Sequence, residues 1–266
     1  MARVVTAGGS AIGVEEAASG VPDSASVRAL PIIFLHGVGS DKSVWAPQLE
    51  HFSATRRALA LDYPGYGESD PAPAGTTRDD FAAAILAAMD ALDVDRGHVC
   101  GLSLGGVIAI AMHHAAPDRC ASLILADTFA AHPDGQAIYE RSIAASEQMS
   151  ELAAARTPVL LAPGASEELH STVRETMAGI DPLAFRIGAK AVWLADQRDR
   201  VSAIAVPTLV LVGDQDKVTP PELSQELAEA IPGAGLVTLA GAGHLSNIER
   251  PVDFNTAVQV FIERAE

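Results

Sequence analysis

The sequence predicts an α/β protein with a mostly parallel, eight-stranded sheet flanked by helices. Short apolar runs alternate along the chain with longer helix-like segments, which is typical of parallel strands joined by crossover helices. Several runs are apolar at every position, as expected for strands that are buried on both faces. The 266 residues, of which 48% are hydrophobic, are enough for one domain with a sizeable core.

Eight segments have the composition of strands. The first two, around Val4 and over residues 12–16, indicate edge or antiparallel strands. The run over 31–35 is apolar throughout and fits a central parallel strand. The remaining strands are expected over residues 57–61, 98–101, 122–126, 208–212 and 235–239.

Helix signals fall between the later strands. Thr77 followed by Asp80 is an acidic capping signal, and Thr219-Pro220-Pro221-Glu222 is a capping box with proline at the first helical position. Helices are therefore expected over residues 81–92, 104–114, 222–230 and 254–264.

The alternation of strands and helices is interrupted between the sixth and seventh strands. Residues 129–200 contain helix-like segments without a convincing strand, which predicts a helical cap there. The core domain would then comprise residues 1–128 and 201–266. Met149, Met177 and Trp193 of this cap could line an apolar pocket, or they could form the small core of the cap itself.

Composition restricts the partners and the location. With 18 basic and 34 acidic residues the formal net charge is -16, which argues against nucleic acid as a partner. No apolar run approaches the length of a membrane span, and no secretory signal is evident. Cys100 and Cys120 indicate buried free thiols rather than a disulfide framework. We therefore expect a cytoplasmic location and no membrane association; the oligomeric state is not predicted.

The strongest functional signal is Gly101-Leu102-Ser103-Leu104-Gly105, a G-x-S-x-G motif between a predicted strand and a predicted helix. A sharp strand-to-helix turn forces the central serine into a strained conformation, so only small residues fit beside it. Ser103 is the candidate nucleophile. The alternative is a glycine-rich turn with an incidental serine.

Two backbone N–H groups are candidates for an oxyanion hole. The N–H of Leu104 would lie at a helix N-terminus, where donors are unpaired and negative charge is favoured. A second donor is expected in the loop after the third strand, where Leu35-His36-Gly37-Val38-Gly39 suggests the N–H of Val38.

A serine nucleophile needs an adjacent base. Of the eight histidines, His244 follows the last predicted strand in Gly241-Ala242-Gly243-His244, at the edge of the sheet where Ser103 would lie. His113 and His114 are adjacent on one predicted helix, so they cannot face the same way. His244 is the candidate base.

The acid that orients this base is expected after the seventh strand. Asp216 lies far enough beyond the end of the strand to bend back towards the next loop, whereas Asp214 lies almost directly after the strand. Asp127, directly after the sixth strand, is a further possibility. Asp216 is preferred, and Asp214 and Asp127 remain alternatives. The chain order Ser103, Asp216, His244 matches one known arrangement of such triads.

These motifs resemble those of the α/β-hydrolase superfamily over nearly the whole chain. The resemblance is carried by residues 35–39, 62–69, 101–106, 213–216 and 243–244. Within the superfamily, residues 43–48 and 244–250 resemble the 3-oxoadipate enol-lactonase group and its carboxylesterase neighbours. The chain departs from the enol-lactonases at Pro64, where their D-x-R-G-x-G segment has an arginine.

The resemblance implies an α/β-hydrolase fold with a helical cap after strand 6, and it favours Asp216 as the acid. It also implies a serine hydrolase that cleaves a small-molecule carboxylic ester or lactone through an acyl-enzyme on Ser103, with no cofactor and no metal. Perhydrolysis without a cofactor, C–C bond hydrolysis and ligand reception without turnover remain alternatives on the same scaffold.

Overall fold

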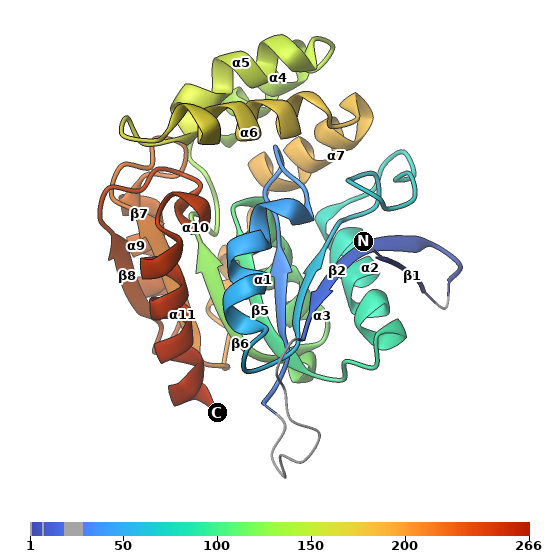
Figure 1. Ribbon diagram of the computed structural model, residues 1–266, viewed down its shortest axis with the longest axis vertical. Coiled ribbons are helices and arrows are strands. Elements are labelled where there is room, and N and C mark those ends of the chain that lie inside the picture. The colour runs from blue at the N-terminus through green and yellow to red at the C-terminus, as the bar shows by residue number, and fades with distance from the viewer. Residues whose placement is uncertain (1, 7, 19–28) are drawn as a thin grey trace.

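The computed structural model describes residues 2–6, 8–18 and 29–266. Its centre is a mixed sheet of eight strands in the order β1-β2-β4-β3-β5-β6-β7-β8 (Figure 1). β2 pairs antiparallel with β1 and β4, and every other pairing is parallel. The strands are β1 Ala2–Val5, β2 Ala11–Ala17, β3 Ile32–Leu35, β4 Ala58–Leu61, β5 Gly97–Leu102, β6 Cys120–Ala126, β7 Thr208–Gly213 and β8 Gly235–Leu239. The predicted fold class is confirmed.

Helices cover both faces of this sheet. On one face lie α1 (Ala46–Phe52) and α11 (Pro251–Ala265), and on the other lie α2 (Arg78–Ala91), α3 (Leu104–Ala115) and α9 (Pro221–Ala230) (Figure 1). The short elements are η1 Lys42–Trp45, η2 Pro117–Arg119, α8 Arg198–Val201 and α10 Ser246–Glu249. Because both faces are covered, β3, β4, β5, β6 and β7 are buried at every position.

Helix boundaries differ from the expectations mainly at the N-termini. Thr77 and Asp80 form a reciprocal capping box, so α2 begins at Arg78 rather than at residue 81. α11 begins at Pro251, which suits the first turn of a helix because proline lacks the N–H that would have no acceptor there. α1 was not expected. Its seven residues are too few to show a clear helical period.

A group of helices separates β6 from β7. α4 (Gly135–Ala145), α5 (Met149–Leu160), α6 (Glu167–Ala178) and α7 (Pro182–Trp193) lie above the carboxyl ends of the strands (Figure 1). This agrees with the helical cap expected after strand 6. Ala131 and Asp196 form an isolated antiparallel bridge where the chain leaves and re-enters the core.

Both cysteines are free and buried, as the sequence predicts. Cys100 lies in β5 and Cys120 begins β6. Burial raises the pKa of both thiols, that of Cys120 to about 12, so neither is a reactive thiolate near neutral pH. Within the described part of the chain, none of the helices combines the length and the apolar character that a membrane span requires.

Candidate active site

Ser103 occupies the turn between β5 and α3. Its φ of 56° and ψ of -114° are rare for a residue with a side chain. The turn is possible because its neighbours are small: a Cβ on Gly101 would overlap the carbonyl of Gly105, and one on Gly105 would overlap the carbonyl of Leu35. The turn therefore has the geometry expected of the G-x-S-x-G motif.

Two hydrogen bonds fix the backbone of this turn. The N–H of Ser103 donates to the carbonyl of Ala126 at 2.9 Å, and the hydroxyl of Thr128 donates to the carbonyl of Ser103 at 2.8 Å. Both partners lie at the end of β6 or just beyond it, so the neighbouring strand supports the strained residue. A residue keeps a φ of this kind only where the surrounding contacts hold it in place.

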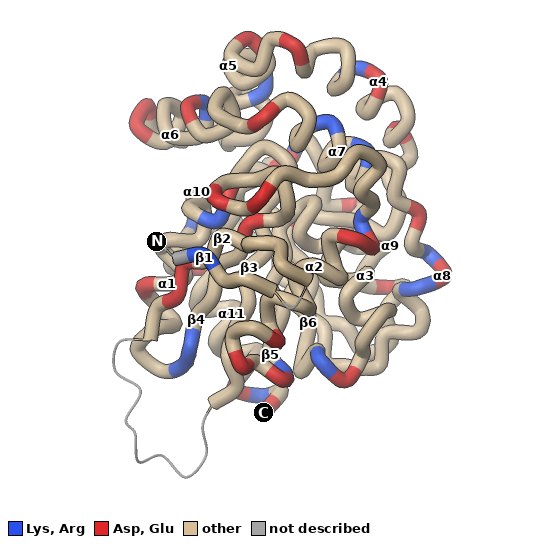
Figure 2. The backbone as a smooth tube through the Cα atoms, turned by 90° about the vertical axis from the view of Figure 1, so that its right-hand side faces the viewer, with Lys and Arg blue, Asp and Glu red and all other residues tan. Residues whose placement is uncertain are grey.

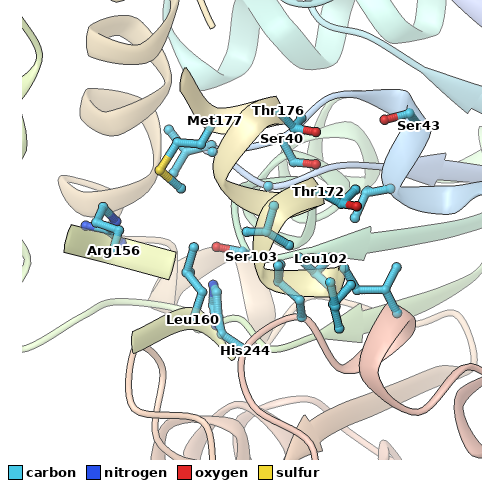
Figure 3. Close-up of a pocket in the computed structure, with 18 of the residues that line it drawn as sticks. Ser40, Ser43, Leu102, Ser103, Arg156, Leu160, Thr172, Thr176, Met177 and His244 are labelled. Atoms are coloured by element: carbon cyan, nitrogen blue, oxygen red, sulfur yellow. The ribbon is translucent and has the colours of Figure 1, made fainter. Parts of the chain in front are cut away.

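His244 and Asp216 form a hydrogen-bonded pair. The loops after β7 and β8 approach closely, because a Cβ on Gly213 would overlap the carbonyls of Ala242 and Gly243. Across this contact, His244 Nδ1 lies 2.8 Å from Asp216 Oδ2. Both residues are buried. Figure 3 shows the side chains of His244 and Ser103 next to each other, and both line one pocket.

Asp216 is held by a second set of donors. The backbone N–H groups of Val218 and Thr219 donate to its Oδ1 at 2.7 and 3.0 Å, and the Thr219 hydroxyl donates to its Oδ2 at 2.6 Å. Burial alone would raise the pKa of Asp216. The charge of His244 and these hydrogen bonds outweigh burial and lower the pKa below its usual value. Asp216 is thereby kept ionised next to the imidazole.

This arrangement corrects the expected cap of α9. Thr219 does not cap that helix: the N-cap is Pro220, without a side-chain hydrogen bond. The Thr219 hydroxyl instead contacts Asp216 and lies 3.2 Å from His244 Nδ1. Nothing in the local sequence indicates this, because the competing partners are brought there by the fold.

The other two acids contact different groups. Asp214 Oδ1 accepts the N–H of Gly241 at 2.7 Å. Asp127 is fully buried, accepts the N–H of Gly213 at 2.9 Å and accepts the hydroxyl of Ser246. Among the residues that the structure describes, Asp216 is the carboxylate that forms an ion pair with His244.

The loop after β3 passes close to Ser103. A Cβ on Gly37 would lie 3.5 Å from the Cβ of Ser103. The Tyr63 hydroxyl donates to the carbonyl of His36 at 2.9 Å, and the Tyr66 hydroxyl donates to that of Val38 at 3.3 Å, so two carbonyls of this loop are fixed. Leu104 is the first residue of α3, where N–H groups have no acceptor within the helix. The structure thus brings the loop of Val38 close to Ser103, which directly precedes the start of α3.

The pocket over Ser103 has a volume of about 300 Å³ and is mainly apolar (Figure 3). The core contributes Leu102, Leu245 and Ile248, and the cap contributes Leu160 and Val173, among others. Met177 and Trp193 line it as well, whereas Met149 is buried elsewhere in the cap. Arg156 also reaches the wall of the pocket, and no pattern in the sequence distinguishes it from other scattered arginines of the cap.

Within residues 2–6, 8–18 and 29–266, no group of three or more His, Cys, Asp and Glu side chains is placed to hold a metal ion.

Three further hydrogen bonds, not expected from the sequence, connect the base to the cap. The N–H of His244 donates to the carbonyl of Leu160 at 2.8 Å, and Glu249 accepts the N–H groups of Gly243 and Ala162 at 2.9 and 2.7 Å.

Comparison with known proteins agrees with this architecture. A model of the alpha/beta hydrolase family matches residues 32–257. The chain belongs to this family. The 3-oxoadipate enol-lactonase 2 of Acinetobacter baylyi is 30% identical to it over 240 residues, which are 88% of each chain.

Solved structures of alpha/beta hydrolases show the same fold. The enol-lactonase from Burkholderia xenovorans aligns with 98% of this chain and 100% of its own, at 29% identity and a TM-score of 0.89. A thermophilic esterase from Thermogutta terrifontis, solved with malate bound, aligns with 99% of this chain and 98% of its own, at 26% identity and a TM-score of 0.87. The protein is thus an alpha/beta hydrolase related to enol-lactonases and esterases.

Proposed function

We propose that this alpha/beta hydrolase cleaves a carboxylic ester or lactone through an acyl-enzyme on Ser103. The observation that carries the proposal is the 2.8 Å contact between His244 and Asp216, in the same pocket as a serine on a strained strand-to-helix turn. A weak hydroxyl nucleophile needs this combination of a base and an orienting acid. The relatives named above support an ester or lactone as the substrate.

In the proposed reaction, Ser103 Oγ attacks the carbonyl carbon while His244 Nε2 takes its proton. Asp216 accepts the N–H of Nδ1, which fixes the tautomer and stabilises the imidazolium. The N–H groups of Val38 and Leu104 would stabilise the oxyanion, and one such donor is typically worth about 10²–10³-fold in rate. His244 then protonates the leaving alkoxide. A water molecule deprotonated by His244 cleaves the acyl-enzyme and restores Ser103.

The test is turnover of p-nitrophenyl butyrate by wild-type protein and two serine variants. Wild-type protein should show many turnovers per molecule, and Ser103→Ala should lose at least about 10⁴-fold in kcat. Ser40 is another hydroxyl in the same pocket, so Ser40→Ala is the matched control and should retain acylation. Turnover that survives Ser103→Ala would refute the mechanism.

The same experiment separates the hydrolase from a ligand receptor on this fold. A receptor that retains the triad would release p-nitrophenol once per molecule or not at all. Assays of peracid formation and of C–C bond cleavage on the same sample, each repeated with Ser103→Ala, would show whether either reaction exceeds ester hydrolysis.

A further inference from the structure

Arg156 is a cation in the wall of the catalytic pocket. Arg156 lies on α5 and is half-buried, yet within the described ranges its guanidinium forms neither a hydrogen bond nor an ion pair. Two other arginines of the region are paired, Arg186 with Glu147 and Arg200 with Asp79. Among the described residues, the exposed cap arginines Arg141 and Arg174 also lack a carboxylate partner, so what distinguishes Arg156 is its half-buried place in the wall of the pocket.

A second cavity, with a volume of about 340 Å³, adjoins the first at this arginine. The two cavities share Arg156 and Trp193 in their walls. The second is also lined by the exposed cations Arg141 and Lys217, and among the described residues neither cavity has an Asp or Glu in its wall. The region is therefore locally basic, although acidic residues are spread over α4, α5, α6 and α10 (Figure 2).

Two further donors at this junction lack an acceptor. Trp193 Nε1 and Ser142 Oγ are both buried, and neither atom has a hydrogen-bond partner in the part of the chain that the structure describes. An indole N–H is only a donor and a guanidinium has no acceptor, while a serine hydroxyl can also donate. Because neither atom has accessible surface, neither can contact a bound substrate directly, and Arg156 is the donor at this junction that remains partly exposed.

Arg156 remains charged in this setting. Burial, together with the nearby charge of Arg141, lowers its pKa, but a guanidinium is protonated at any physiological pH. A partly desolvated cation favours an anionic partner strongly. A carboxylate suits the planar guanidinium, because two parallel N–H···O bonds can form.

The helix that carries Arg156 is fixed relative to the reacting centre. Leu160, one turn further along α5, accepts the N–H of His244 at 2.8 Å and lines the same pocket. Figure 3 shows Arg156 on one side of the pocket and Leu102 on the other, with Ser103 between them in this view. The walls between these groups are mainly apolar.

We propose that Arg156 binds a carboxylate of the substrate, so that the natural substrate is an ester or lactone bearing a carboxylate on a short apolar chain. This inference rests on the proposed esterase or lactonase activity and adds the substrate class. The reacting carbonyl lies at Ser103, the aliphatic segment contacts the apolar walls, and the carboxylate reaches Arg156.

The test compares esters that differ only in charge at the far end. Monoethyl glutarate, adipate and pimelate are each paired with the ethyl ester of the corresponding ω-amide, and hydrolysis is followed by proton release. For at least one length, wild-type kcat/KM should favour the carboxylate by about 10-fold or more, as expected for charge-assisted hydrogen bonds.

The variants assign this preference to Arg156. Arg156→Met should lower kcat/KM for the carboxylate by about 10- to 100-fold and change that for the amide by less than about 3-fold. Arg156→Lys should restore part of the preference. Arg174→Met, an exposed cap arginine outside both cavities, is the matched control and should retain the full preference. No preference in wild-type protein, or equal losses for both substrates in Arg156→Met, would overturn the proposal.

A binding measurement keeps this inference separate from the proposed reaction. Monoethyl adipate should raise the Tm of Ser103→Ala protein more than its ω-amide counterpart does, and Arg156→Met should abolish the difference. If no ester is turned over but this difference persists, the carboxylate site stands and the hydrolase proposal fails. If esters are turned over through Ser103 without any effect of Arg156, the hydrolase stands and the carboxylate site fails.

Discussion

Three carboxylates at the ends of β6 and β7 illustrate how partners determine the role of a residue. Asp216 contacts His244, Asp214 accepts the N–H of Gly241, and Asp127 accepts the N–H of Gly213. The pKa of Asp216 is lowered by the charge of His244 and by hydrogen bonds, against the effect of burial. Burial instead raises the pKa of Asp127 well above its usual value, and the negative charge of Asp216 adds to the rise. Asp216 is therefore the acid in the proposed mechanism.

Asparagine substitutions test this assignment. Asp216→Asn removes the charge and favours the wrong tautomer of His244, so kcat should fall by about 10³–10⁴-fold, as in other triads. Asp214→Asn retains an acceptor for Gly241 and should change kcat by less than about 3-fold. Steady-state kinetics with p-nitrophenyl butyrate distinguishes them. A harmless Asp216→Asn would show that another residue orients the base.

Residues whose geometry depends on the local chain could be predicted from the sequence, and those defined by distant partners could not. The strand-to-helix turn at Ser103 needs glycines at fixed spacing after an apolar strand, and both features are visible in the sequence. The local sequence predicts Thr219 to be a helix cap, because a threonine before Pro-Pro-Glu is a common capping signal. Its contacts with Asp216 and His244 exist only in the folded protein. Arg156 gave no signal for the same reason.

At the scale of elements, the loop of His244 is attached to the cap through Glu249. This residue ends α10, and its two carboxylate oxygens accept the N–H groups of Gly243 and Ala162. Gly243 precedes the proposed base, and Ala162 follows α5. The side chain therefore positions the base relative to the helix that carries Arg156.

Replacing Glu249 with glutamine should disturb this connection. The amide has one oxygen, so its NH₂ group would face one of the two backbone N–H donors. We expect Glu249→Gln to lower the free energy of unfolding by about 1–3 kcal/mol, because a hydrogen bond to a charged group is lost. It should also lower kcat. Thermal unfolding and steady-state kinetics measure both effects. Glu222→Gln, at an exposed position on α9, is the control, and equal behaviour of the two variants would contradict the expected link.

The elements that could be predicted are those with a strong periodic or compositional signal. All eight strands lie where the sequence predicts them. The signal is clearest for β3 to β7, because a strand buried on both faces needs a continuous apolar run. The cap was expected from the absence of such runs over residues 129–200, but the number and packing of its helices were not. α5 contains Pro158 and has no clear apolar face, so a helix there is only weakly indicated by the residues. The boundaries of the cap as a separate domain stay a prediction.

Across the whole molecule, carboxylates with shifted pKa values make stability depend on pH in two directions. The pKa of Asp216, of Glu266 beside Arg56 and of Asp79 beside Arg200 is lowered in the folded protein. The stability that these groups contribute is present above their unfolded pKa values and is lost as pH falls through the folded ones. Acid should therefore unfold the protein.

Asp127 acts in the opposite direction, and this can be isolated. Because its folded pKa is raised, the folded state binds its proton more tightly than the unfolded state does. Its contribution is thus complete below the unfolded pKa and declines by up to about 1.4 kcal/mol per pH unit as pH rises towards the folded pKa.

Asparagine at position 127 resembles the protonated acid: its oxygen can accept the N–H of Gly213, and its amide can donate to Ser246. The Tm of Asp127→Asn relative to that of wild-type protein should therefore increase between pH 5 and pH 8. This range lies above the unfolded pKa of about 3.9, so the unfolded state has already lost the proton there. Asp214→Asn, at a residue outside the buried network, provides the control, and a Tm difference that does not change with pH would show that Asp127 is ionised throughout this range.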